Sequence, residues 1–177
     1  MNRLNNQRVY LAGAMDRVPD GGKTWRENIT PVLLKMGLTV FNPLIKPSEI
    51  GREDENTVML KKRLKQEKRY DELSKVMKTI RNVDLRLVDI SDFLIVNLDL
   101  DIHPCGTYEE IFLANREKKP ILINVAQGKQ NAPDWLFGTI PHQMIFDSWL
   151  DLQEYLMYID GAEEIVTYNR WYFFKDV

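Results

Sequence analysis

Short apolar runs recur along the chain and predict buried strands. Each run is apolar almost throughout and is bounded by turn residues, as expected of strands that are covered on both faces of a parallel sheet. The runs are residues 9–13, 38–41, 93–98 and 120–125, and a shorter strand is expected at 143–146.

Segments with helical spacing of apolar residues separate these strands. The first begins at Thr24, which forms a capping-box pattern with Glu27 three residues later, and it ends at Gly37. A loop is expected over residues 45–56. The other predicted helices are one long charged helix from Thr57 to Arg81, a helix from Gly106 to about Lys118, and a helix over 149–159, followed by a packed terminal segment or subunit contact at Trp171–Phe174.

The alternation of strands and helices indicates an α/β fold. We expect a doubly wound, mainly parallel sheet flanked by helices, of the Rossmann or flavodoxin type. A length of 177 residues fits one domain, which is expected to span residues 1–177. Ligands of such sheets bind beyond the carboxyl ends of the strands, which directs attention to the loops after Leu11, Leu98 and Val125.

Composition narrows the class of protein further. There are 24 Lys and Arg residues against 26 Asp and Glu, and a formal net charge of −2 argues against a nucleic-acid-binding protein. No apolar run reaches the roughly 18 to 20 residues of a membrane span, and the N-terminus lacks the apolar region of a signal peptide. The single cysteine, Cys105, indicates a reducing compartment. These features predict a soluble cytoplasmic protein.

The segment of residues 97–110, at the end of the most apolar strand, has the most side chains that could take part in catalysis. Glu110 is expected in the first turn of the next helix, where the helix dipole favours an ionised carboxylate that can act as a nucleophile. Acidic residues are common in first turns, so Glu109 or Glu110 could instead complete an N-terminal cap begun at Thr107. The spacing alone leaves both interpretations open.

Three groups of residues follow one another along the chain in a fixed order. They are Tyr10-Leu11-Ala12-Gly13, then Asp84 and Asp92, then Gly106-Thr107-Tyr108-Glu109-Glu110-Ile111. In this order they resemble the nucleoside 2-deoxyribosyltransferase family. The resemblance extends from about Val9 to about Phe146, and the loop from Asp16 to Arg26 is similar to that of phage and microbial relatives.

The resemblance implies a role for each matching residue. Glu110 matches the nucleophile that attacks C1′ of a 2-deoxyribosyl group, and Tyr10 matches the tyrosine that orients it. Asp84 matches an aspartate that contacts the base and serves in its protonation. A second free base then attacks the sugar–enzyme intermediate. Two alternatives stay open: hydrolysis of a 2′-deoxynucleoside 5′-monophosphate, and binding of nucleotides without catalysis.

A wider set of residues is implied to contact the nucleoside or nucleotide. Asp92 opens a strand and is expected to have mainly a capping role. The family places an aspartate where this chain has Pro104, so Asp99 or Asp101 is expected to supply that carboxylate. The substrate-binding set is Gly13, Asp16, Arg17, Trp25, Arg26, Asp92, Asp99, Asp101, Gly106, Thr107, Asn131 and Trp135.

The resemblance also implies a homo-oligomer, because the family brings residues from a neighbouring subunit into the site. Asn131, Asp134 or Trp135 match that region. No cofactor is expected, since carboxylates can carry out glycosyl transfer unaided. No metal is expected either, because His103, Cys105 and His142 have no zinc-ligand spacing.

The loop before the first helix and the long charged helix each allow another interpretation. The segment Gly21–Thr24 resembles part of a phosphate-binding loop, but Arg17 stands where that motif needs glycine. Arg17, Lys23 or Arg26 could still meet a substrate 5′-phosphate, or the loop could simply be solvated. The exposed side of the long charged helix is interpreted as a solvated face or an oligomer contact. Cys105 is expected to be a small buried residue.

Overall fold

The computed structural model describes residues 2–47, 51 and 53–174, and it contains a five-stranded sheet in which every pairing is parallel. The strand order is β2-β1-β3-β4-β5. From β1, the chain adds β2 on one side of the sheet and then β3, β4 and β5 on the other, so the strand order reverses between β1 and β3. This confirms the doubly wound α/β fold of the flavodoxin type. The strands are β1 (Arg8–Gly13), β2 (Thr39–Phe41), β3 (Phe93–Leu98), β4 (Ile121–Val125) and β5 (Ile145–Phe146).

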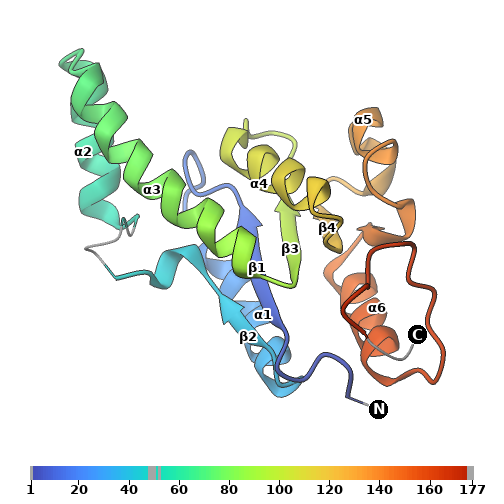
Figure 1. Cartoon of the computed structure of the whole chain (residues 1–177). Helices are drawn as coiled ribbons and strands as arrows, with labels where there is room; N and C mark the ends of the chain where they lie inside the picture. Colours follow the sequence, from blue (N-terminus) through green and yellow to red (C-terminus); the bar gives the residue numbers. More distant parts are fainter. Residues whose placement is uncertain (1, 48–50, 52, 175–177) are drawn as a thin grey trace.

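Helices cover both faces of the sheet. In Figure 1, α3 and α4 lie in front of the strands, and α1 lies behind them. Trp25 of α1 stacks on Trp149 of α6 at 5.4 Å between ring centroids, so α6 covers the same face as α1. The helices are α1 (Lys23–Lys35), α2 (Glu55–Gln66), α3 (Tyr70–Ile90), α4 (Cys105–Arg116), α5 (Asp134–Phe137) and α6 (Trp149–Gly161).

The long charged helix expected from Thr57 to Arg81 is wrong, because the structure has two helices there. The first, α2, ends at Gln66, and Lys68 adopts a left-handed backbone with φ 57° before α3 begins at Tyr70. The two helices form a hairpin that extends away from the sheet (Figure 1). The second half of α3 returns to the sheet and buries Ile80, Asp84 and Val88. The expected loop of residues 45–56 includes 48–50 and 52, which lie outside the described residues.

The capping box at Thr24 is also wrong. Helix α1 begins at Lys23, and no side chain of the residue before it caps the helix. Instead, the carboxylate of Asp20 accepts hydrogen bonds from the backbone N–H groups of Gly22 and Thr24. Hydrogen bonds from Thr24 and Gly22 lower the pKa of Asp20 to about 2, so it is ionised at neutral pH and complements the helix dipole.

The aromatic segment near the C-terminus is packed, as expected. Trp171 is only 1% exposed, and its indole N–H donates to the hydroxyl of Tyr155. Its ring packs against Phe93 of β3 and Phe174. In the part of the chain that the structure describes, no helix has both the length and the apolar character needed to cross a bilayer.

Candidate active site

A cavity of about 320 Å³ opens beyond the carboxyl end of β1, where the strand order reverses. Parallel α/β sheets bind their ligands at this position, because the loops on either side diverge there. The cavity is bounded by the loop after β1, by α3, and by the start of α4. Its charged lining residues are Asp16, Glu53, Arg81, Asp84, Glu109 and Glu110.

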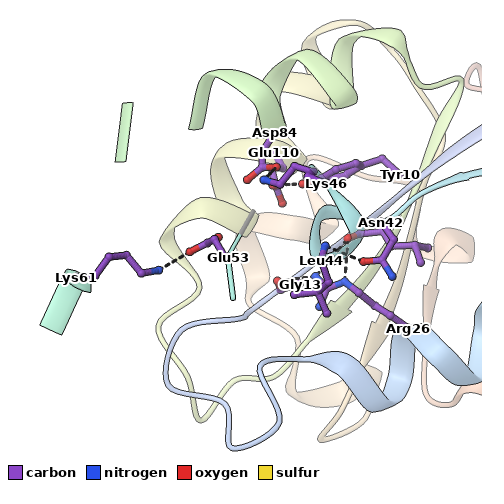
Figure 2. A network of polar contacts seen from close by, with 11 residues as sticks. Tyr10, Gly13, Arg26, Asn42, Leu44, Lys46, Glu53, Lys61, Asp84 and Glu110 are labelled. Atoms are coloured by element: carbon purple, nitrogen blue, oxygen red, sulfur yellow. Dashed lines mark hydrogen bonds and ion pairs between the residues drawn. The ribbon is translucent and has the colours of Figure 1, made fainter. Parts of the chain in front are cut away.

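Tyr10 and Glu110 meet at the inner end of this cavity. Tyr10 lies on β1 and is fully buried, and its hydroxyl donates a hydrogen bond of 2.7 Å to Oε1 of Glu110 on α4 (Figure 2). Strand and helix are both fixed by the core, since the neighbouring residues Leu11 and Ile111 are completely buried. The carboxylate is therefore held in one orientation while one side remains open to the cavity.

The surroundings of Glu110 favour its protonated form. Burial raises its pKa to about 8, and the nearby carboxylate of Asp84 adds to this, whereas the hydrogen bond from Tyr10 opposes it. Glu110 is the sixth residue of α4, which begins at Cys105. The expectation that it lies in the first turn and is ionised by the helix dipole is wrong, and so is an N-terminal capping role for it.

Asp84 lines the cavity from α3 and forms a buried ion pair with Lys46. The distance from Nζ of Lys46 to Oδ1 of Asp84 is 2.5 Å, and the two side chains are 3% and 9% exposed. Desolvation raises the pKa of Asp84, and the ammonium group of Lys46 opposes that rise. Figure 2 shows Lys46, Asp84 and Glu110 grouped on one side of the site.

A second buried lysine joins the wall of the cavity to α2. Nζ of Lys61 donates to Oδ1 of Asp16 at 2.8 Å and also to Glu53, and the Lys61 side chain is only 6% exposed. Asp16 follows β1, and Glu53 precedes α2. The ion pairs therefore connect the loop after β1 to the helical hairpin.

Arg81 and Glu109 join α3 to α4 on the exposed side of the cavity. Nε of Arg81 donates to Oε2 of Glu109 at 2.8 Å, which lowers the pKa of this carboxyl. The neighbouring Cys105 is exposed, so the expectation of a buried cysteine is wrong. Among the described residues, no group of three or more His, Cys, Asp or Glu side chains could hold a metal ion.

Arg26 does not reach the cavity, contrary to the expectation that it contacts substrate. Its guanidinium is completely buried and donates to the backbone carbonyls of Leu11, Gly13 and Gly22. Arg26 therefore holds the turn between β1 and α1, where buried carbonyls need donors. Arg17 and Lys23 line a different cavity, which lies next to the first and shares Asp16 and Glu53 with it.

Asp92 directly precedes β3, at the end of the sheet opposite the cavity, and it does not line the cavity. It accepts hydrogen bonds from the backbone N–H and the guanidinium of Arg8, which agrees with the capping role. Asp99 and Asp101 both accept from the side-chain amide of Gln127 and do not line the cavity. Neither replaces the family aspartate at Pro104, although Pro104 itself lines the cavity.

The remaining members of the expected set divide into two groups. Gly13, Gly106 and Thr107 line the cavity with Asp16. A Cβ on Gly13 would come within 2.9 Å of the Trp25 ring, so this turn has no room for a side chain. Trp25 itself packs between α1 and α6 rather than in the cavity.

Asn131 and Trp135 lie outside the cavity of their own chain. The side-chain amide of Asn131 donates to the carbonyl of Gln127, and Trp135 is 78% exposed on α5.

Lys46, Glu53 and Lys61 are the site residues that the sequence analysis missed. Each pairs with a residue from another element, and Lys46 is separated from Asp84 by 38 positions. The loop after β2 also begins at the carboxyl end of a parallel strand, where ligands of such sheets bind. Lys46 lies in that loop, so the same rule could have found it.

Comparison with known proteins agrees with the fold. The 2-deoxyribosyltransferase of the psychrotolerant bacterium Bacillus psychrosaccharolyticus has a TM-score of 0.57 at 15% identity, covering 92% of this chain and 96% of that one. A 2-deoxyribosyltransferase of Leishmania mexicana has a TM-score of 0.53 at 18% identity, covering 85% and 96%. The chain therefore shares the fold of these enzymes.

The other similarities are weaker or absent. A CMP N-glycosidase of Clostridium botulinum has a TM-score of 0.48 at 19% identity, covering 86% and 99%, which is too low a similarity to support an argument. Compared by sequence, the chain matches no protein-family model and no curated protein.

Proposed function

We propose that the protein belongs to the nucleoside 2-deoxyribosyltransferase family and transfers a 2-deoxyribosyl group between nucleobases. The observation that carries this proposal is the hydrogen bond of 2.7 Å from Tyr10 to Glu110, in a cavity that Asp84 also lines. It joins a fixed carboxylate to an open pocket on a fold that two 2-deoxyribosyltransferases share. The three residues from the resemblance thus lie at one site.

In the first half of the reaction, Glu110 in its ionised form attacks C1′ of the nucleoside. The C1′–N bond breaks as the bond from C1′ to the glutamate oxygen forms, and the electron pair leaves with the base, which takes up a proton on the side of Asp84. In the second half, another base attacks C1′ and releases Glu110. In glycoside chemistry, positioned carboxylates of this kind act as nucleophile and acid in reactions that pass through oxocarbenium-like transition states.

The charges around the cavity favour a nucleoside over a nucleoside 5′-monophosphate. Arg17 and Lys23 line the adjacent cavity, and Arg26 is buried against backbone carbonyls. Of the described residues that line the cavity itself, Arg81 is the only cation, and it is paired with Glu109 while five carboxylates surround the space. Behind the lining, Lys46 is paired with Asp84, and Lys61 is paired with Asp16 and Glu53. Each of these cations is therefore already occupied by a carboxylate, which argues for transfer between nucleosides rather than nucleotide hydrolysis.

A homo-oligomer belongs to the same proposal. Trp135 is largely exposed on α5, and neither it nor Asn131 lines the cavity of its own chain. The resemblance implies that residues of this region enter the cavity of a neighbouring subunit. A monomer by light scattering at assay concentration would contradict this part.

Base exchange tests the function directly. The protein is incubated with 2′-deoxyadenosine or dAMP together with a second free base, and products are separated by chromatography, with Glu110→Ala as the control. Exchange from the nucleoside, lost in the control, supports transfer. Free base and deoxyribose 5-phosphate from dAMP indicate the nucleotide hydrolase instead. Binding without products indicates a non-catalytic protein.

A further inference from the structure

Lys46 lies directly behind Asp84 as seen from the cavity. Asp84 lines the cavity, whereas Lys46 does not, and its side chain is only 3% exposed. The 2.5 Å contact from Nζ to Oδ1 therefore connects Lys46 to the reaction space through the aspartate (Figure 2).

This pairing creates a difficulty for Asp84 as an independent acid. Desolvation raises the pKa of Asp84, but the ammonium group of Lys46 acts against that rise by favouring the ionised form, and an ionised carboxylate has no proton to give. The charged groups that act on Asp84 besides Lys46 are Glu53, Glu110 and the buried Arg26. A departing nucleobase nevertheless needs a proton, because its anion is a poor leaving group.

We propose, resting on the function proposed above, that Lys46 supplies the proton that Asp84 passes to the departing base. As the C1′–N bond breaks, a proton moves from Nζ of Lys46 to the carboxylate of Asp84, and Asp84 passes it to the base nitrogen. Asp84 stays a carboxylate and Lys46 becomes a neutral amine. Glu110 meanwhile loses its negative charge by forming the ester bond to C1′, so the total charge of the site is unchanged.

The second half of the reaction restores Lys46. The incoming base loses its N–H proton to Asp84, which returns one to the neutral amine as Glu110 is released. Lysine suits this step because its ammonium group can give up a proton to a neighbouring base, whereas the guanidinium group of arginine stays charged. In this scheme Lys46 is a positioning residue for protonation, since it acts on the substrate through Asp84.

A substrate that needs no proton separates this role from a structural one. The base of 7-methyl-2′-deoxyguanosine already carries a positive charge and leaves without protonation. The rate of base release in a single turnover, with no acceptor base present so that only the first half of the reaction is measured, is compared for the two nucleosides with the wild type, Lys46→Met and Lys46→Arg. The matched control is Lys119→Met, which removes a lysine that is bound to the carbonyls of Val88 and Asp89 away from the cavity.

For 2′-deoxyadenosine, we expect both Lys46 variants to lose about 100-fold or more in the single-turnover rate of base release, the usual contribution of a positioned acid. For 7-methyl-2′-deoxyguanosine, both should stay within about tenfold of the wild type, since no proton transfer is needed. Lys119→Met should match the wild type on both substrates.

Three results would overturn the inference: equal losses on the two substrates, no loss on either, or recovery of deoxyadenosine cleavage in Lys46→Arg. If the wild type releases no base from either nucleoside, the proposed function fails and this inference with it.

Removing Lys46 alone leaves a buried carboxylate unpaired, which can prevent folding. Thermal melts by circular dichroism identify that case. The double variant Lys46→Met/Asp84→Asn then replaces it, because both buried charges are removed together. It should still cleave 7-methyl-2′-deoxyguanosine and lose 2′-deoxyadenosine cleavage. Equal activity on both substrates would contradict the role of the pair.

Discussion

The hydroxyl of Tyr10 lies 2.7 Å from the carboxylate of Glu110 and joins the first strand of the sheet to the helix after the third. Burial raises the pKa of Glu110 to about 8, and this hydrogen bond works in the opposite direction. Tyr10 therefore stabilises the ionised form, which is the form that can attack a sugar carbon. The pair controls both the orientation and the protonation of the proposed nucleophile.

Tyr10→Phe should move the pH dependence of the reaction upward. Without the hydrogen bond, the pKa of Glu110 rises further, so the alkaline rise in kcat/KM should begin at higher pH than in the wild type. A hydrogen bond to a charged group contributes about 1.5 to 3 kcal/mol, so the rate at pH 7 should fall roughly tenfold or more. Tyr108→Phe is the control, since Tyr108 lies on α4 outside the cavity lining. An unshifted profile would remove Tyr10 from this role.

Glu110→Gln should stabilise the protein at alkaline pH. An ordinary glutamate has a pKa near 4.3, so between there and about 8 the folded wild type binds more protons than the unfolded chain. Its free energy of unfolding therefore falls as the pH rises through that window. The neutral amide lacks this penalty, so its advantage in Tm should grow from pH 5 to pH 9, by roughly 2 to 4 °C for each kcal/mol of stability that the wild type loses.

The neighbouring variant Glu109→Gln provides the control for that melt series. The pKa of Glu109 is lowered by Arg81, so its contribution to stability is already complete above the ordinary glutamate pKa. Its Tm difference from the wild type should stay constant from pH 6 to pH 9. A constant difference for Glu110→Gln as well would mean that Glu110 titrates normally.

Asp84→Asn should separate turnover from binding. The amide keeps the shape of the side chain but cannot pass a proton to the departing base, so kcat for 2′-deoxyadenosine should fall about 100-fold or more. The Kd for the nucleoside, measured by isothermal titration calorimetry, should change far less. A wild-type rate would remove Asp84 from the catalytic set.

Arg26→Met should destabilise the protein rather than change its substrate. Its guanidinium satisfies the buried carbonyls of Leu11, Gly13 and Gly22. An unsatisfied buried group costs about 1 to 3 kcal/mol, so urea denaturation should show a loss of about 3 kcal/mol or more. Lys23→Met, at an exposed residue of the same helix, should change stability little. Equal stability of the two variants would contradict the structural role of Arg26.

The sheet could be predicted from sequence because its central strands carry an unambiguous signal. Residues 93–98 are apolar almost throughout, and the structure places β3 there with the same bounds. The break between α2 and α3 carried no such signal, because no glycine or proline lies between Gln66 and Tyr70. Lys68 makes the turn with φ 57°, a conformation that sequence patterns do not predict for lysine.

The site was predictable where a motif places the residue and not where a distant contact decides its environment. The resemblance selected Tyr10, Asp84 and Glu110, and the structure brings these three together. The sequence suggests a substrate contact for Arg26 because nothing in its neighbours shows that backbone carbonyls surround it. Lys46 depends on Asp84 for its burial, and only the folded chain brings the two together.

Covalent trapping at Glu110 tests the central claim most directly. A nucleoside with fluorine at C2′ of its arabinosyl sugar slows breakdown of a sugar–enzyme ester, because fluorine destabilises an oxocarbenium-like transition state. The protein is incubated with this nucleoside, quenched in acid, and analysed by intact-mass and peptide mass spectrometry. We expect one fluorosugar added to the peptide that contains Glu110, and none in Glu110→Ala. The absence of an adduct on a protein that exchanges bases, or an adduct at another residue, would contradict the account.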